Sequence, residues 1–458
     1  MSIKKDGVRI GELYGFADGP VIAALEFNER GCLVKFRQKI TAREVREALD
    51  GDHNEIPDEM VFKDSFGTLW LASSRIVRTR FNVPERTERN IQVDRVVERC
   101  FSGSSFSSVF GMKTVVNGLY RWADVKSPIF FIDCFDADGQ AVDVRAKNIP
   151  SIDLRGPMGG KLSTSIVPHQ ERWTGRVGLD YRIYFQTSSD SLQSWNDHAQ
   201  VHGMMQDVMC LVYGKPCGVD IVQVSDDEGS SGRGNAAMVR RRWAEVYEPG
   251  FGRAVQHVDG LDPEKDSPLF VRSDMNSSLF SEFINSWQQS WSRPLRIATT
   301  TLFQSEATVE AKLIQVAVAL ESLGYTIKTN KGQELKSVPG FESLVNEVVN
   351  DFISKDEDDR KSRREFLGKI FRGPSHSDRG VNPSKWVKKF KEAYLGAKHA
   401  DRNLSDPYDS HALSEQGMKL IRVWFGKRVG VDIRLMAGNL DFRVDGGLRK
   451  TPFHSPAD

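Results

Sequence analysis

This 458-residue sequence has few cysteines, no long apolar run and almost no net charge. The five cysteines are odd in number and show no Cys-x-x-Cys spacing, which favours free thiols in a reducing compartment over a disulfide framework. No stretch approaches the roughly 20 apolar residues that cross a bilayer. The first residues also lack the apolar core of a signal peptide. We therefore expect a cytoplasmic protein without a membrane span.

The balance of charge excludes a whole-molecule attraction to nucleic acid. The chain has 63 basic and 62 acidic residues, for a formal net charge of +1, so any basic surface must be local. Residues 361–398 form the one clear imbalance, with eleven basic and three acidic side chains and a local net charge of +8. Such a run is usually a solvated helix face, but beside a phosphodiester site it would suit a surface that guides a polyanion.

The length predicts two or three domains, and the first of them is rich in strands. Short segments with many β-branched and aromatic residues alternate with turn signals such as ADGP and NERG. This spacing favours an antiparallel sandwich or barrel-like sheet over βαβ units. The expected strands are VRIGELYGF, VIAALEFN, CLVKFRQKI, GTLWLASSRIV, SPIFFIDCFD and GLDYRIYFQTS.

The second half of the chain changes to helical periodicity. One helix is expected at SLQSWNDHAQVHGMMQDVMCLVYGKP, and the Gly/Ser-rich stretch SDDEGSSGRGN is expected to be an exposed loop. Further on, Val309, Leu313, Val316, Leu320 and Leu323 follow the stripe of a buried helix. At least four helices are expected there, which makes a bundle. The predicted class is α+β, with a β-rich domain at 1–180, a mixed connecting region at 181–275, a helical bundle at 276–435 and a tail at 436–458.

Three motifs are set aside, and no metal or cofactor is expected. RGPMGGKLSTS lacks the spacing of a phosphate loop, since three residues separate its first glycine from Gly160 and Leu162 follows the lysine. His198 and His202 share a helix face, as zinc ligands often do, and Asp207 or Cys210 could complete such a site. Ala199 replaces the glutamate of a catalytic HExxH motif, so two ordinary surface or partly buried histidines are the preferred interpretation. The aspartates of IDCFDADG are explained by a hairpin turn.

The most informative stretch is HADRNLSDPYDSH, from His399 to His411. The preceding helix is expected to bury Trp386, Phe390, Tyr394 and Ala397. The next helix is expected to open at His411 and to bury Leu413, Leu420, Ile421 and Trp424. Because the loop between them is short, Arg402 and His411 can converge at one end of the bundle.

An Arg-Asn pair at a helix end, followed by a short polar loop and a histidine, resembles the R-x(4–6)-H signature of HEPN domains, many of which are metal-independent ribonucleases. The helix VAVALESL is similar to the corresponding helix of ApeA-like HEPN domains, with Glu321 at its polar position. The β-rich half, which contains GELYGFADGP, resembles the ApeA N-terminal domain. Together these likenesses imply an ApeA-like anti-phage defence protein.

The resemblance implies roles for named residues. His411 would act as general acid and base, because histidine ordinarily titrates near pH ~6.5. Arg402 would stabilise the phosphate, and Asn403 would orient the phosphate or the histidine, or cap the helix. Glu321 would position Arg402. RNA-binding residues would be Lys385, Lys388, Lys389 and Lys398. The expected partners are RNA, with tRNA as one candidate, a second copy of the chain through the helical bundle, and a phage-derived trigger.

The spacing of the motif departs from the family pattern. Eight residues separate Arg402 from His411, more than the family's four to six. His399 is therefore a rival for His411. The pair Arg372 and His376 is a weaker rival, because its gap is too short and contains Pro374. The long spacing also keeps open a second hypothesis, a non-catalytic HEPN-like protein that dimerises through its helices and binds a ligand or protein through its β-rich half.

Overall fold

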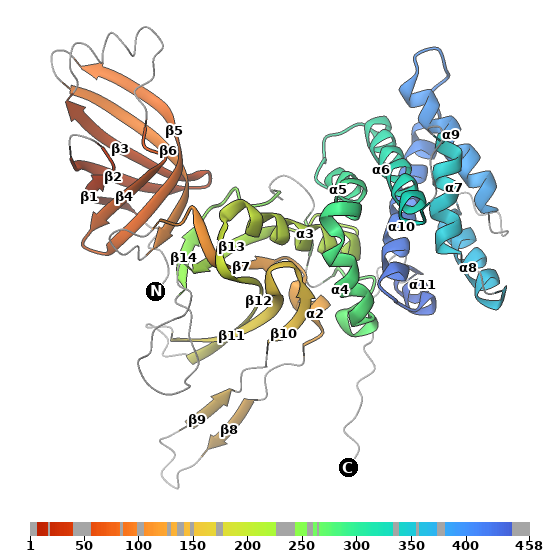
Figure 1. The fold of residues 1–458 in the computed structure, drawn as a ribbon, viewed down its shortest axis with the longest axis horizontal. Helices are drawn as coiled ribbons and strands as arrows, with labels where there is room; N and C mark the ends of the chain where they lie inside the picture. Colours follow the sequence, from red (N-terminus) through yellow and green to blue (C-terminus); the bar gives the residue numbers. More distant parts are fainter. Residues whose placement is uncertain are drawn as a thin grey trace.

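The protein is an α+β molecule in which a β-rich region precedes a region of helices, as predicted. Figure 1, a view of the computed structural model, shows a strand barrel at one end, a second sheet with α3 in the middle, and helices α6–α11 at the other end. The structure describes residues 7–16, 19–39, 56–82, 86–98, 105–125, 130–134, 142–146, 151–170, 177–225, 243–253, 260–262, 265–332, 339–353, 357–372 and 381–441.

The first six strands close into an antiparallel barrel. Neighbours pair in the order β6-β3-β2-β1-β4-β5, and the additional pairing of β5 with β6 closes the ring. Alternate residues point inward, so Leu25, Val34 and Ile91, opposite one another on three adjacent strands, are fully buried. The strands are β1 (Val8–Tyr14), β2 (Val21–Asn28), β3 (Gly31–Lys39), β4 (Glu59–Asp64), β5 (Gly67–Asn82) and β6 (Arg86–Glu98).

A second antiparallel sheet continues from the barrel through β14, which pairs with β6 on one side and with β13 on the other. Its order is β10-β11-β12-β7-β13-β14. One of its strands, β12, crosses residue 180, so this sheet spans both sides of the boundary predicted there. The strands are β7 (Ser108–Val116), β10 (Ile152–Gly156), β11 (Gly160–Gln170), β12 (Val177–Ser194), β13 (Val219–Ser225) and β14 (Ala244–Tyr247), with β8 (Phe130–Cys134) and β9 (Val142–Ala146) as a separate hairpin.

Helix α3 (Trp195–Tyr213) packs on this second sheet and is buried almost all round. The Ser194 side chain accepts a hydrogen bond from the Asp197 amide at its start, and Gly214 adopts a left-handed conformation at its end. Its apolar residues, among them Met205, Val208 and Leu211, belong to one core that extends from the second sheet into the helices. Helix α3 is therefore the element around which the β-rich and helical regions join.

The helices pack mainly around α6, which contacts α5, α7 and α10. The approach of α6 to α7 requires Gly324, because a Cβ there would lie 2.1 Å from the Leu344 carbonyl oxygen. The helical elements are α2 (Leu119–Ala123), α4 (Ser277–Asn285), α5 (Ser292–Thr301), α6 (Val309–Asn330), α7 (Phe341–Phe352), α8 (Glu357–Ile370), α9 (Pro383–Lys398), α10 (Pro407–Arg428) and α11 (Ile433–Asp441), with short turns η1 (Pro157–Gly159), η2 (Arg272–Asp274) and η3 (Trp287–Trp291). None of the helices in the described ranges combines the length and apolarity of a membrane span.

Helix α10 is joined to α3 by a buried arginine. Arg422 is only 5% exposed. It donates hydrogen bonds to the carbonyl oxygens of Leu211, at 2.7 Å, and Val212, at 3.0 Å. These carbonyls belong to the last turn of α3, where helical backbone partners run out. Helix α10, which carries His411, is therefore bonded directly to α3, the helix that packs on the second sheet.

Candidate functional site

The turn between α9 and α10 carries the predicted catalytic residues. Helix α10 begins earlier than expected, because Asp406 caps it by accepting hydrogen bonds from the amides of Tyr408, at 2.8 Å, and Asp409, at 3.3 Å. Pro407 occupies the first helical position, which suits its fixed φ and its missing N–H. His411 is consequently the fifth residue of α10 and not its first, about 6 Å along the axis from the start of the helix.

Arg402, Asn403 and His411 are all exposed at this end of the helical region. None of the three side chains forms a hydrogen bond or ion pair with another residue of the described ranges. The backbone of the turn is nevertheless well packed, because the Arg402 amide donates to the His399 carbonyl at 3.1 Å and a Cβ at Gly396 would collide with the Asn403 carbonyl oxygen. The turn thus presents three unpaired polar side chains on a fixed backbone.

Of the two rival histidines, His399 lies within the described residues and His376 does not. His399 ends α9 and is exposed, three residues before Arg402. It therefore remains an alternative to His411. His376 lies outside the described residues, as do the acidic loop SDDEGSSGRGN beyond Ser225 and Asp136 and Asp138 of IDCFDADG.

Glu321, on α6, is half-buried and does not pair with Arg402 in this structure. Its charge instead acts on Lys398, at the end of α9. The pKa of Lys398 is raised chiefly by its hydrogen bond to the Tyr394 hydroxyl, with a smaller contribution from Glu321. The predicted role of Glu321 in positioning Arg402 stays a prediction.

The four lysines predicted to bind RNA are all exposed along α9, because this helix turns Trp386, Phe390 and Tyr394 inward. Lys389 forms an ion pair of 3.0 Å with Asp409 on α10. Lys398 donates a hydrogen bond of 3.1 Å to the Tyr394 hydroxyl. The side chains of Lys385 and Lys388 have no partner among the described residues.

A hollow of about 630 Å³ lies between α7, α8 and the start of α9, and we call it the α7–α9 hollow. Sequence reasoning detected its charge, as part of the basic run 361–398, but not its shape. Three exposed basic side chains line it beside a single carboxylate. They are Arg364, Lys369 and Arg372, and the carboxylate is Glu365.

A second hollow, of about 470 Å³, lies between α3, residues 248–253 and α5. At one end Arg95 binds both carboxylate oxygens of Glu248 at 3.0 Å and stacks on Trp195 at 3.8 Å. Burial raises the pKa of Glu248 even though Arg95 opposes this shift. At the other end the buried Asp207 forms ion pairs with Arg253 and, at 3.5 Å, with Arg296. These partners are far apart in sequence, so no local pattern could have predicted them.

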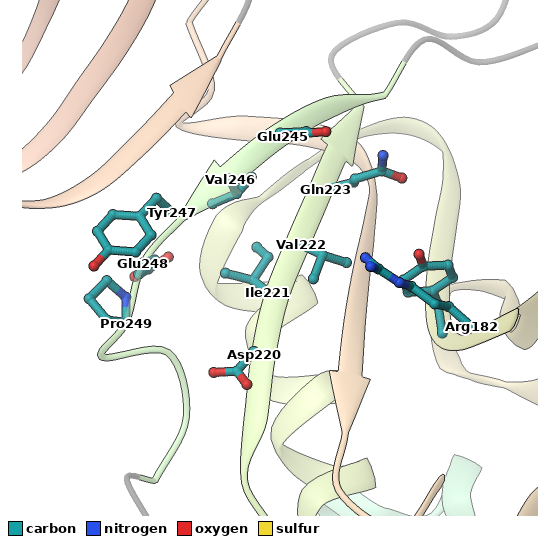
Figure 2. A pocket seen from close by; sticks show the side chains of 11 residues that line it. Arg182, Asp220, Ile221, Val222, Gln223, Glu245, Val246, Tyr247, Glu248 and Pro249 are labelled. Carbon is teal, nitrogen blue, oxygen red and sulfur yellow. The ribbon is translucent and has the colours of Figure 1, made fainter. Parts of the chain in front are cut away.

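A third hollow, of about 480 Å³, is shown in Figure 2. Glu245, Val246 and Tyr247 reach it from β14, residues 220–223 from β13, and Arg182 from β12. Nearby, burial and the charge of Lys161 lower the pKa of Lys113 to about 8. The lining mixes acidic, basic and apolar side chains, and nowhere in the described ranges do three metal-binding side chains cluster.

The paired histidines of α3 are structural. Both are fully buried, with the Nε2 of His198 3.1 Å from the Val109 carbonyl oxygen and its Nδ1 2.7 Å from the Thr187 hydroxyl. The Thr187 hydroxyl is also 3.0 Å from the Nε2 of His202, whose Nδ1 is 2.7 Å from the Thr114 hydroxyl. With neutral rings, one proton arrangement satisfies every group in this chain. Burial first, and then His198, holds the pKa of His202 well below its ordinary value.

Comparison with known families concerns the β-rich half. Residues 67–287 match the family model described as ApeA N-terminal domain 1. The match begins with β5 inside the barrel and ends just after α4, so it includes the second sheet and α3. It supports the predicted likeness to ApeA for this part of the chain, although the stretch GELYGFADGP lies before it. No curated protein and no solved structure matches the chain.

Proposed function

We propose that this protein acts in anti-phage defence and that its helical region is a metal-independent endoribonuclease of the HEPN type. The observation that carries the nuclease proposal is the exposure of Arg402 and His411, without partners among the described residues, at one end of the helices. The match of residues 67–287 to an ApeA N-terminal domain supports the defence role. The contact of α10 with α3 offers a route by which the β-rich half could restrain the nuclease or respond to a phage-derived trigger.

The chemistry follows from the residue types. RNA carries its own nucleophile, the 2′-hydroxyl, and a histidine can accept its proton as the oxygen attacks phosphorus. The bond from phosphorus to the 5′-oxygen then breaks, and that oxygen takes up a proton from an acid. The products are a 2′,3′-cyclic phosphate and a 5′-hydroxyl end. Arg402 would offer its fixed fork of donors to the phosphate as charge develops, and Asn403 would orient the phosphate.

A single His411 provides one proton-transfer group, whereas the reaction moves two protons. A homodimer that brings two turns together would provide a second histidine. We therefore propose assembly through the helical region, with RNA, tRNA included, as the substrate. Exposed lysines of α9 would hold the substrate backbone.

The decisive experiment is cleavage of purified tRNA and total RNA by the full chain in EDTA. We expect cyclic phosphate ends from the wild type, a loss of about 100-fold or more for His411→Ala, and a similar loss for Arg402→Ala. His399→Ala tests the rival assignment, because it removes the other exposed histidine near the same turn. Activity lost in His399→Ala but kept in His411→Ala would transfer the role to His399. Equal cleavage by all variants would reveal a contaminant or another site.

The second candidate function is a non-catalytic interaction protein. The eight residues between Arg402 and His411 favour it, and no hydrogen bond joins these two side chains in the structure. Overexpression separates the two candidates. A ribonuclease should slow growth, and His411→Ala should relieve this effect while the protein level stays constant. Equal growth defects for wild type and His411→Ala would favour the interaction protein.

A further inference from the structure

Within the part of the chain that the structure describes, the basic side chains of the α7–α9 hollow lack the acidic partners that neighbouring basic side chains have. Close by, Arg363 pairs with Asp359 at 2.8 Å, and Lys391 pairs with Glu342 at 3.0 Å. The side chains of Arg364, Lys369 and Arg372 have no such partner among the described residues, although they line one concave surface. An excess of unpaired positive charge in a hollow attracts and concentrates anions.

One wall of the hollow is held in place by α9 and α10. Gln416 of α10 donates to the Arg372 carbonyl oxygen at 3.2 Å and accepts from the Trp386 indole at 2.8 Å. The Phe371 and Trp386 rings stack with centroids 4.1 Å apart. The backbone that carries Arg372 is therefore fixed relative to the two helices that flank the Arg402–His411 turn.

We propose that the α7–α9 hollow is a docking site for the phosphate backbone of a base-paired segment of the RNA substrate, away from the scissile bond. This inference rests on the proposed ribonuclease function. Arginine forks suit phosphate oxygens, and contacts of this kind fix the register of a nucleic acid without reading its sequence. Asn346 and Asn350 of α7, which also line the hollow, add amide donors for phosphate or sugar oxygens.

The length of α9 sets the separation of the two sites. The hollow lies at the start of this helix and the Arg402 turn at its end, and its 16 residues span about 24 Å. An A-form RNA duplex rises roughly 2.8 Å per base pair, less than B-form DNA, so about nine base pairs separate the two contacts. The exposed Lys385 and Lys388 lie between them. The preferred substrate is thus an RNA with a stem of about nine base pairs next to the cleaved position.

The test compares two triple variants of the full chain. Arg364→Ala/Lys369→Ala/Arg372→Ala empties the hollow of positive charge. Arg30→Ala/Arg78→Ala/Arg293→Ala removes the same charge from exposed positions elsewhere. Each triple is also made with His411→Ala, so that binding can be measured without cleavage. The probes are a synthetic RNA hairpin with a stem of about nine base pairs and a single-stranded RNA of about five nucleotides.

We expect the hollow variant to bind the hairpin about tenfold or more weakly, with the slope of log affinity against log salt reduced by about 3, one unit for each lost phosphate contact. In cleavage its KM for the hairpin should rise while kcat and the cutting of the pentanucleotide stay unchanged. The control triple should lose little of either.

Equal hairpin affinity and equal salt slope in the two triple variants would overturn the docking site. An acidic protein would then be the partner to test for the hollow. Failure of wild type to cut either RNA would count against the ribonuclease instead. Binding in the His411→Ala background would still decide whether the hollow holds RNA. A cooperative unfolding transition like that of wild type confirms that the hollow variant is folded.

Discussion

Helix α3 and the α9–α10 turn both carry histidines next to other polar side chains, but they use them in opposite ways. In α3, His198 and His202 are fully buried and bonded to threonine hydroxyls, and Asp207 is bonded to arginines. In the turn, Arg402 and His411 are exposed and have no partner among the described residues. Polar groups whose hydrogen bonds are all satisfied inside the protein hold the fold together, whereas unpaired exposed groups are free to bind a substrate.

The largest effect on stability is expected in α3, when the buried charge of Asp207 is removed. Asp207→Ala leaves Arg253 half-buried without its carboxylate, and we expect a loss of about 3 kcal/mol of unfolding free energy. Asp207→Asn, which keeps part of the hydrogen bonding, should lose less. Urea unfolding followed by tryptophan fluorescence measures both. An unchanged midpoint for Asp207→Ala would show that this cluster is not structural.

The next largest difference in unfolding free energy is expected between variants of His202 in α3 and His411 in the turn. His202→Ala leaves the hydroxyls of Thr114 and Thr187 short of a buried partner and opens a cavity beside Phe185, so we expect a loss of about 2 kcal/mol or more. His411→Ala should change stability by less than about 0.5 kcal/mol, because its side chain is exposed. Thermal unfolding of both variants tests this contrast. Equal destabilisation would mean that His411 also has a structural role.

This contrast also marks what could be predicted from the sequence. The spacing of His198 and His202 suggested a shared helix face, but the interpretation as surface or partly buried histidines was wrong, because both are fully buried and bonded to threonines. Their burial could not be foreseen, because Thr114 comes from β7 and Thr187 from β12. For the turn, the sequence predicted the helices on both sides, but the Asp406–Pro407 start moved His411 inside α10.

The strands show the same limit. β2 has the bounds expected from its alternating pattern, and β5 begins where predicted but extends to Asn82. β6 was missed because its sequence, RTERNIQVDRVVE, is mostly charged and polar. Its residues Ile91 and Val93 are buried inside the barrel, and its backbone lies in register between β3 and β5. Local pattern identifies strands with one clear apolar face, but the closure of a barrel depends on partners far away in sequence.

The pH dependence of stability should follow the buried histidine. Because the folded pKa of His202 lies well below its unfolded value of about 6.5, the unfolded chain binds a proton first. The contribution of His202 is therefore complete above pH ~6.5 and is lost as the pH falls below it, by up to about 1.4 kcal/mol per pH unit. The difference between wild type and His202→Gln isolates this effect from all other groups. Parallel stability curves from pH 7 to pH 5 would contradict it.

The smallest effect is expected at the exposed ion pair between Lys389 and Asp409, which joins α9 to α10 at 3.0 Å. Both side chains are half-exposed or more, so a double-mutant cycle with Lys389→Ala and Asp409→Asn should give a coupling of roughly 0.2–1 kcal/mol that fades with added salt. Here stability and function should separate, in contrast to Asp207. Asp409→Asn removes the carboxylate that competes with phosphate for Lys389, so RNA binding should tighten slightly at low salt while the unfolding midpoint falls only slightly. Weaker RNA binding in Asp409→Asn, measured by fluorescence anisotropy, would show that Asp409 holds Lys389 in the geometry that RNA requires.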